Sequence, residues 1–243
     1  MPLTAEQFDE KVQELRMMLI EQGKNARTLL DLAFDAFLIP DEQKAREAIA
    51  ADDSIDEIDV QIEQRAVELL NAAAAETVQL SPKSIRAVLT LVKVNNELER
   101  AADAGVTIAE RAISMSGNPV QFPPTTRVMT NSVLGILRDL IRSYESRDAT
   151  LARLVLQSQD AVVAFKSEIL RQAETRVAAG DMSVDLAFDL HELASQCLLI
   201  SDHATNIAEQ IIYQNTGVIV RHQEGRWVDI QRDMDAGADA EAE

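Results

Sequence analysis

Apolar side chains recur every three to four positions along most of this chain, in long stretches separated by short breaks that contain proline or glycine. That spacing is typical of amphipathic helices, in which a buried face repeats about every 3.6 residues. The pattern therefore predicts six long helices. They are expected over about residues 4–38, 40–75, 81–115, 126–146, 148–178 and 183–214.

Several predicted helices begin with residues that satisfy the free amide groups of a first turn. Thr4 and Gln7 have the spacing of a capping box, in which each side chain bonds the backbone amide of the other residue. Pro40 is expected in the first turn of the second helix, because proline has no amide hydrogen to leave unpaired there. Ser81 and Pro82 are expected to cap and to start the third helix.

A linker over residues 118–125 contains three of the six prolines of the chain and divides the pattern in two. Residues 1–117 and 126–224 each contain three predicted helices. The expected fold is therefore all-α, with two pseudo-symmetric three-helix bundles. The remaining residues, 225–243, are acidic and rich in alanine and glycine, and are expected to form a disordered tail.

The two halves also repeat in sequence. Residues 103–110 read Asp-x4-Ile-Ala-Glu, and residues 202–209 follow the same pattern 99 residues later. Both segments fall at the same relative place on the third helix of their half. Matching helix order together with a matching motif indicates an internal duplication.

Composition restricts the partners of the protein. Apolar residues make up 47% of the chain, which is enough for a large core, but the formal net charge is −18. Such a surface disfavours nucleic acid and anionic membranes, which require clustered lysine and arginine. The chain has no signal-peptide pattern, no apolar stretch long enough to span a bilayer and a single cysteine, Cys197. We therefore expect a cytoplasmic protein without internal disulfides.

Two pairs of carboxylates have the spacing of one helical turn: Asp52 with Asp56, and Glu99 with Asp103. The pairs lie about 32 and 28 Å from the turn between the second and third helices, so two antiparallel helices would bring them to the same height. Four clustered carboxylates repel one another unless they are protonated or bind a cation. Oxygen ligands suit magnesium, calcium, manganese or iron. The alternative is that both pairs simply face water.

Catalysis has little support in the sequence. None of the three histidines, His191, His203 and His222, completes the Glu-x-x-His motif of helical di-iron enzymes. There is no glycine-rich loop to bind phosphate, and Cys197 lies in an apolar stretch that is typical of a core. We therefore expect a protein that is not an enzyme.

Motifs on the second, third and sixth predicted helices, with four residues that follow them, form a recognisable combination. They are Asp52-x-x-Ile55-Asp56, Glu99-Arg100-x-x-Asp103, Asp202-His203-Ala204-Thr205-Asn206-Ile207-Ala208-Glu209, Tyr213, Gly217, Arg221 and His222. This combination resembles the PhoU family of phosphate-signalling proteins over about residues 8–222. The last of the motifs is the most specific part of the resemblance.

The resemblance implies a pair of three-helix bundles and a homodimer. It implies a cytoplasmic negative regulator of phosphate uptake and of the phosphate-starvation response, located at the inner membrane only through its partners. Those partners would be the ATPase subunit of the phosphate ABC transporter and a phosphate-responsive histidine kinase. Some family members bind iron or zinc clusters at acidic motifs, so Asp52, Asp56, Glu99 and Asp103 are the expected ligands for iron, zinc, manganese or magnesium.

The second half departs from this motif. Asp160 and Asp202 match, but Ala164 and Leu198 stand where their partner carboxylates would be. We therefore expect one competent metal site in the first half and a weak or absent site at Asp160 and Asp202. A metal-binding helical protein or a scaffold without any role in phosphate signalling remains the alternative.

Overall fold

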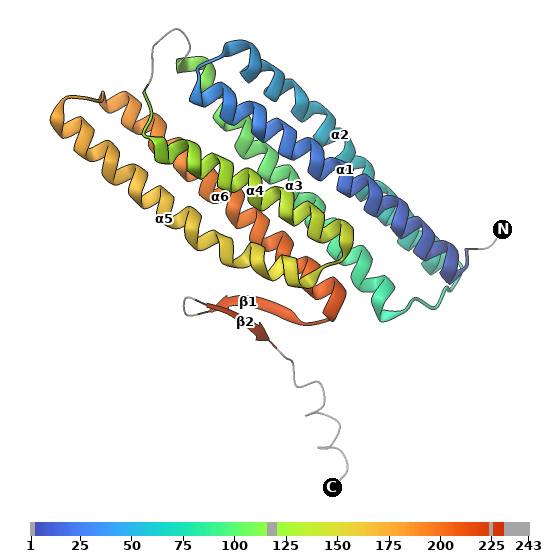
Figure 1. Cartoon of the computed structure of the whole chain (residues 1–243). Coiled ribbons are helices and arrows are strands. Elements are labelled where there is room, and N and C mark those ends of the chain that lie inside the picture. Colours follow the sequence, from blue (N-terminus) through green and yellow to red (C-terminus); the bar gives the residue numbers. More distant parts are fainter. Residues whose placement is uncertain (1–2, 116–120, 224–225, 231–243) are drawn as a thin grey trace.

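The computed structural model describes residues 3–115, 121–223 and 226–230. These residues form six long helices that lie side by side, followed by a β-hairpin at one end of the molecule (Figure 1). None of the helices described is long and apolar enough to cross a membrane. The elements are α1 Ala5–Leu38, α2 Glu42–Ala75, α3 Pro82–Met115, α4 Pro124–Ser146, α5 Ala149–Ala179, α6 Val184–Thr216, β1 Ile219–Gln223 and β2 Arg226–Ile230.

The helix starts largely follow the sequence signals. The capping box at Thr4 is present, with the Thr4 hydroxyl accepting from the Gln7 amide and the Gln7 side chain accepting from the Thr4 amide. Ser81 accepts from the Ser84 amide in the first turn of α3. The expected position of Pro40 is wrong by two residues. Asp41 is the N-cap of α2, because its carboxylate accepts from the Lys44 amide, and Pro40 lies in the preceding turn.

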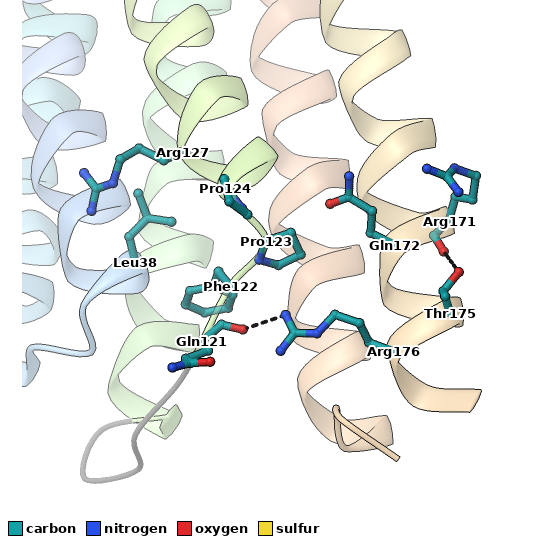
Figure 2. A pocket seen from close by; sticks show the side chains of 10 residues that line it. All are labelled: Leu38, Gln121, Phe122, Pro123, Pro124, Arg127, Arg171, Gln172, Thr175 and Arg176. Atoms are coloured by element: carbon teal, nitrogen blue, oxygen red, sulfur yellow. Dashed lines mark hydrogen bonds between the residues drawn. The ribbon is translucent and has the colours of Figure 1, made fainter. Parts of the chain in front are cut away.

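The linker joins the two halves at one end of the molecule. α4 begins at Pro124, two residues before the expected start, because proline suits a first helical position. Phe122 stacks on Phe37 at the end of α1, with ring centroids 5.3 Å apart. The Arg176 guanidinium of α5 donates to the Gln121 carbonyl at 3.0 Å (Figure 2). The linker is thus held by both halves; its residues 118–120 lie outside the described part of the chain.

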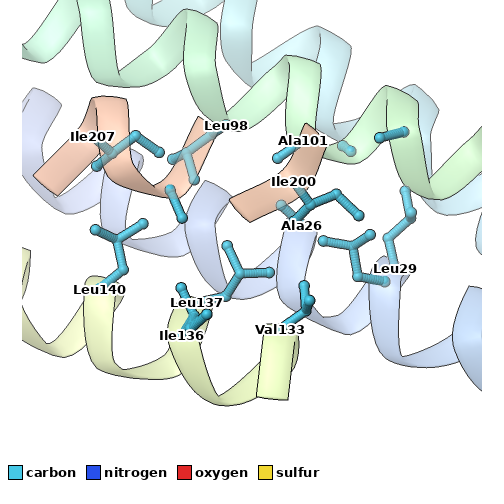
Figure 3. Packing of buried hydrophobic residues seen from close by; sticks show 14 of the residues in the cluster. Ala26, Leu29, Leu98, Ala101, Val133, Ile136, Leu137, Leu140, Ile200 and Ile207 are labelled. Carbon is cyan, nitrogen blue, oxygen red and sulfur yellow. The ribbon is translucent and has the colours of Figure 1, made fainter. Parts of the chain in front are cut away.

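The helices form two bundles that share one core. α1, α2 and α3 pack together, as do α4, α5 and α6, and the halves meet where α3 packs on α6 and α1 on α4. Apolar side chains from these four central helices interdigitate, among them Leu29, Leu98, Leu137 and Ile200 (Figure 3). The six-helix, pseudo-symmetric architecture is therefore confirmed, with α2 and α5 on the outside.

Close approach of α1 and α3 depends on a glycine. A methyl group at Gly105 would lie 2.5 Å from a terminal carbon of Leu29 and 2.8 Å from one of Leu30. The duplicated motif places Ala204 at the corresponding position of α6. A larger residue at position 105 would therefore require the Leu29 and Leu30 side chains of α1 to move.

A β-hairpin follows α6. Gly217 ends the helix with φ of +75°, a conformation that glycine adopts without strain. β1 and β2 then pair antiparallel, with Arg221 opposite Val228 and His222 opposite Trp227. Neither strand was expected from the sequence. The prediction of a disordered tail from residue 225 is wrong over residues 226–230, which form β2.

Packing against the second bundle explains the hairpin. Val220 is fully buried, and the Trp227 indole N–H donates to the Leu156 carbonyl of α5 at 3.1 Å. These contacts stabilise β-favouring residues that lie beside a strongly acidic segment. The composition of residues 225–243, taken as a whole, therefore did not indicate that residues 226–230 form a strand. Residues 231–243 lie outside the described part of the chain.

Candidate functional site

The outer faces of α2 and α3 carry an acidic surface, which we define as Asp52, Asp56, Asp59, Glu99 and Asp103. Asp56 and Asp103 are exposed, while the other three are partly buried. The two helices run antiparallel, so Asp52 lies within electrostatic reach of Asp103, and Glu99 within reach of Asp56 and Asp59. The carboxylate pairs of the two helices therefore lie at one level, on one side of the first bundle.

Burial, together with repulsion between neighbouring carboxylates, raises several pKa values in this surface. Burial, followed by the charges of Asp56 and Asp103, raises the pKa of Asp52 to about 6. Burial and then Asp103 raise the pKa of Glu99, and Arg100 offsets only part of this effect. A bound cation would relieve the same repulsion.

Asp59 is a member of this surface that the pairwise spacing argument did not include. The Asn95 amide of α3 donates to the Asp59 carboxylate at 2.6 Å and to its carbonyl at 3.1 Å. This contact joins α2 to α3 beside the acidic pairs. The sequence shows Asp59 as a third carboxylate on α2. Its contact with Asn95, however, depends on how α2 and α3 are aligned, which the sequence does not show.

The donor chemistry of the acidic surface suits a hard divalent or ferric ion, yet its side chains do not surround a common point. Among the described residues, no three carboxylate, histidine or cysteine side chains are placed to hold a metal ion. Asp52, Asp56, Glu99 and Asp103 remain the residues that would bind one. A metal site there stays a prediction, because binding requires these exposed side chains to turn toward each other.

Replacing Asp52 by asparagine should stabilise the folded protein at pH 7. The folded state raises the pKa of Asp52 from 3.8 to about 6, so it binds the proton more tightly than the unfolded chain. This contribution to stability is complete below about pH 4 and is lost as the pH rises through 6. Because the side chain is partly solvated, we expect a gain of at most about 1 kcal/mol at pH 7.

The measurement is urea unfolding of both proteins between pH 4 and 7 with a chelator present. Asp31→Asn, at an exposed aspartate of α1, serves as the control. A gain for Asp52→Asn that does not grow between pH 4 and pH 7 would contradict the raised pKa of Asp52.

The corresponding place in the second half is arranged differently. Asp202 on α6 accepts a hydrogen bond from the Gln159 side-chain amide of α5, while Asp160 is exposed. Leu198 and Ala164 contribute no oxygen ligand. The amide hydrogen bond engages one oxygen of the Asp202 carboxylate, and a weak or absent second site stays a prediction.

Hydrogen bonds between α3 and α6 bring together residues that the sequence did not link. His203 Nδ1 lies 2.7 Å from Glu97 Oε2, and the Asn206 amide donates to the same oxygen at 3.0 Å. Although burial alone would raise the pKa of Glu97, these two hydrogen bonds hold it below its ordinary value. The motif residues His203 and Asn206 therefore hold the two bundles together.

Further charged contacts extend this interface. Arg221 of β1 pairs with the buried Glu209 of α6, and Arg111 of α3 pairs with the buried Asp189 of α6. Burial raises the pKa of Glu209, an effect that Arg221 opposes and the nearby Glu97 reinforces. Motif residue Arg221 thus positions the hairpin on the end of α6.

Taken together, the chain is a pseudo-symmetric double three-helix bundle with an acidic surface on α2 and α3 and a polar interface between its repeats. A sequence profile described as the PhoU domain matches residues 19–112 and 126–211, one match in each half. The chain belongs to the PhoU family.

Individual relatives agree with this assignment. The chain is 28% identical over 192 residues to the phosphate-specific transport system accessory protein PhoU homolog 1 of Thermotoga maritima, covering 77% of this chain and 80% of that protein. It is 29% identical to the PhoU homolog of Aquifex aeolicus, covering 88% and 95%.

Solved structures share the fold. The PhoU crystal structure from Streptococcus pneumoniae superposes with a TM-score of 0.80 at 20% identity, covering 89% of this chain and 100% of that chain. The PhoU structure from Pseudomonas aeruginosa gives 0.80 at 23% identity, covering 87% and 100%.

Proposed function

We propose that this protein is a non-enzymatic, cytoplasmic regulator that restrains phosphate uptake and the phosphate-starvation response when phosphate is plentiful. The proposal rests on the PhoU-domain match in both halves. It is supported by relatives named as accessory proteins of phosphate-specific transport. The protein would act by contact with the ATPase subunit of a phosphate ABC transporter and with a phosphate-responsive histidine kinase, favouring the inactive state of each partner.

The acidic surface is the proposed contact site for these partners. Its carboxylates lie within electrostatic reach of one another across α2 and α3, so a basic partner surface or a bound cation would relieve their repulsion. A bound metal would supply fixed positive charge that orders these side chains. The protein would act as a homodimer and would reach the inner membrane only through its partners.

A deletion strain tests this role directly. In phosphate-rich medium, loss of the gene should raise expression of phosphate-scavenging genes, and the wild-type protein should restore repression. The variant Asp52→Ala/Glu99→Ala should fail to restore it, because the partner contact loses two central carboxylates. The matched control is Glu14→Ala/Asp31→Ala, which removes two exposed acids from α1.

The outcomes separate the parts of the proposal. Normal repression in the deletion strain would remove the regulatory role. Derepression that the Asp52→Ala/Glu99→Ala variant fully corrects would retain that role and exclude the acidic surface as its contact site. Pull-down with the transporter ATPase identifies the partner, while elemental analysis of protein purified without chelator tests for the metal.

A further inference from the structure

A cavity of about 930 Å³ opens at the end of the molecule where the linker enters α4. α4 contributes Arg127, and the last turns of α5 contribute Arg171 and Arg176. Among the described residues, no carboxylate lines the cavity. In a chain with a net charge of −18, three arginines without an acid in one cavity indicate a site for an anionic ligand.

The arginines lie on opposite walls. Figure 2 shows Arg127 on one side of Phe122 and Pro123, with Arg171 and Arg176 on the other. An elongated ligand with more than one charged group could contact both walls.

Existing contacts decide which arginines are available to such a ligand. Arg171 forms a two-bond pair with Glu168, at 2.9 and 2.7 Å, so part of its charge is neutralised from outside the cavity. Arg176 donates one bond, to the Gln121 carbonyl, and retains further N–H groups. Arg127 is exposed on the first turns of α4. Arg127 and Arg176 are therefore the principal anion-binding side chains.

The remaining walls suit the rest of such a molecule. Phe122, Pro123 and Leu38 give the cavity an apolar side. Gln172 and Thr175 also line it, with their side chains bonded to Glu168 and to the Arg171 carbonyl. α4 also begins at this cavity without a side-chain cap, so the positive end of its dipole adds to the favourable potential for an anion.

We propose that this cavity binds a nucleoside polyphosphate, with phosphates on the arginines and the base against the Phe122 side. The inference does not depend on the regulatory role proposed above. It identifies a ligand site at the α4–α5 end, which is distinct from the acidic surface of α2 and α3.

Calorimetric titration of the full chain with ATP tests the proposal. A chelator is included, so that no metal can bridge ATP to the acidic surface. ATP should bind, and adenosine and inorganic phosphate should bind at least about tenfold more weakly, because each provides only one half of the interaction. Arg127→Gln and Arg176→Gln should each weaken ATP binding by about tenfold. Added salt should weaken ATP binding by the wild type, because salt screens the arginine charges.

Arg138→Gln is the matched control, because Arg138 is an exposed arginine of α4 that pairs with Asp139 and does not line the cavity. It should bind ATP like the wild type. Absence of ATP binding, or unchanged binding by a folded Arg127→Gln/Arg176→Gln variant, would overturn the proposal. Equal affinity for ATP and inorganic phosphate would also overturn it, since the apolar wall would then contribute nothing.

Discussion

Leu29→Ala should lower the free energy of unfolding by about 3 kcal/mol, as expected for a fully buried leucine. Leu29 is 0% exposed and lies in the core shared by both halves (Figure 3). Because that core is continuous, Leu29→Ala should destabilise the second bundle as well, although Leu29 belongs to the first. Both halves should therefore unfold in one transition that the substitution shifts as a whole.

The single tryptophan makes this measurable. Trp227 is held against α5 of the second half, so its fluorescence follows that half, while circular dichroism follows all helices. Leu29→Ala should shift both urea midpoints equally. Leu154→Ala, at an exposed leucine of α5, should change stability by less than about 0.5 kcal/mol. Circular dichroism that separates into two transitions, with the Trp227 midpoint unchanged, would show that the bundles unfold independently.

Arg16→Met should cost about 2–3 kcal/mol of stability. Arg16, from α1, is 9% exposed and donates to the carbonyls of Tyr144 and Glu145 at 2.6 and 2.7 Å. These carbonyls lie in the last turn of α4, where i to i+4 partners run out, and the Tyr144 carbonyl also accepts from the Arg147 amide at 3.4 Å. Burial, and then the nearby Arg147, lower the pKa of Arg16.

Methionine keeps the apolar length of the side chain but removes the donors, the positive charge and the contact of the guanidinium with the Tyr144 ring at 5.4 Å, so the loss measures these interactions together. Arg138→Met removes an exposed, surface-paired arginine from α4 and should leave the urea midpoint at its wild-type value. A wild-type midpoint for Arg16→Met in urea unfolding would mean that water replaces the guanidinium at the end of α4 without cost.

The helices could be predicted because each signal is local. A 3.6-residue periodicity needs no knowledge of neighbours, and caps such as Thr4 and Ser183 act within their own first turn. The hairpin could not be predicted in this way. Its stability depends on Trp227 reaching Leu156, a residue 71 positions away on another helix.

The candidate site likewise combines residues that local spacing predicts with contacts that it does not predict. Spacing places Asp52 and Asp56 on one helix face, and antiparallel packing of neighbouring helices predicts that they meet Glu99 and Asp103. The contact between Glu97 and His203 joins residues 106 positions apart. It depends on how the two bundles are aligned against each other, which no periodicity within one helix determines.

The hydrogen bond from Gln159 to Asp202 has a consequence for how the gene tolerates mutation. In a duplicated protein with two equivalent acidic surfaces, damage to one could be compensated by the other. Here Asp202 instead accepts a hydrogen bond that joins α5 to α6, and Ala164 and Leu198 stand in place of two carboxylates. The second repeat therefore has no copy of the acidic surface proposed above as the partner contact. On that proposal, inactivating substitutions in the gene should concentrate on the α2–α3 side of the molecule.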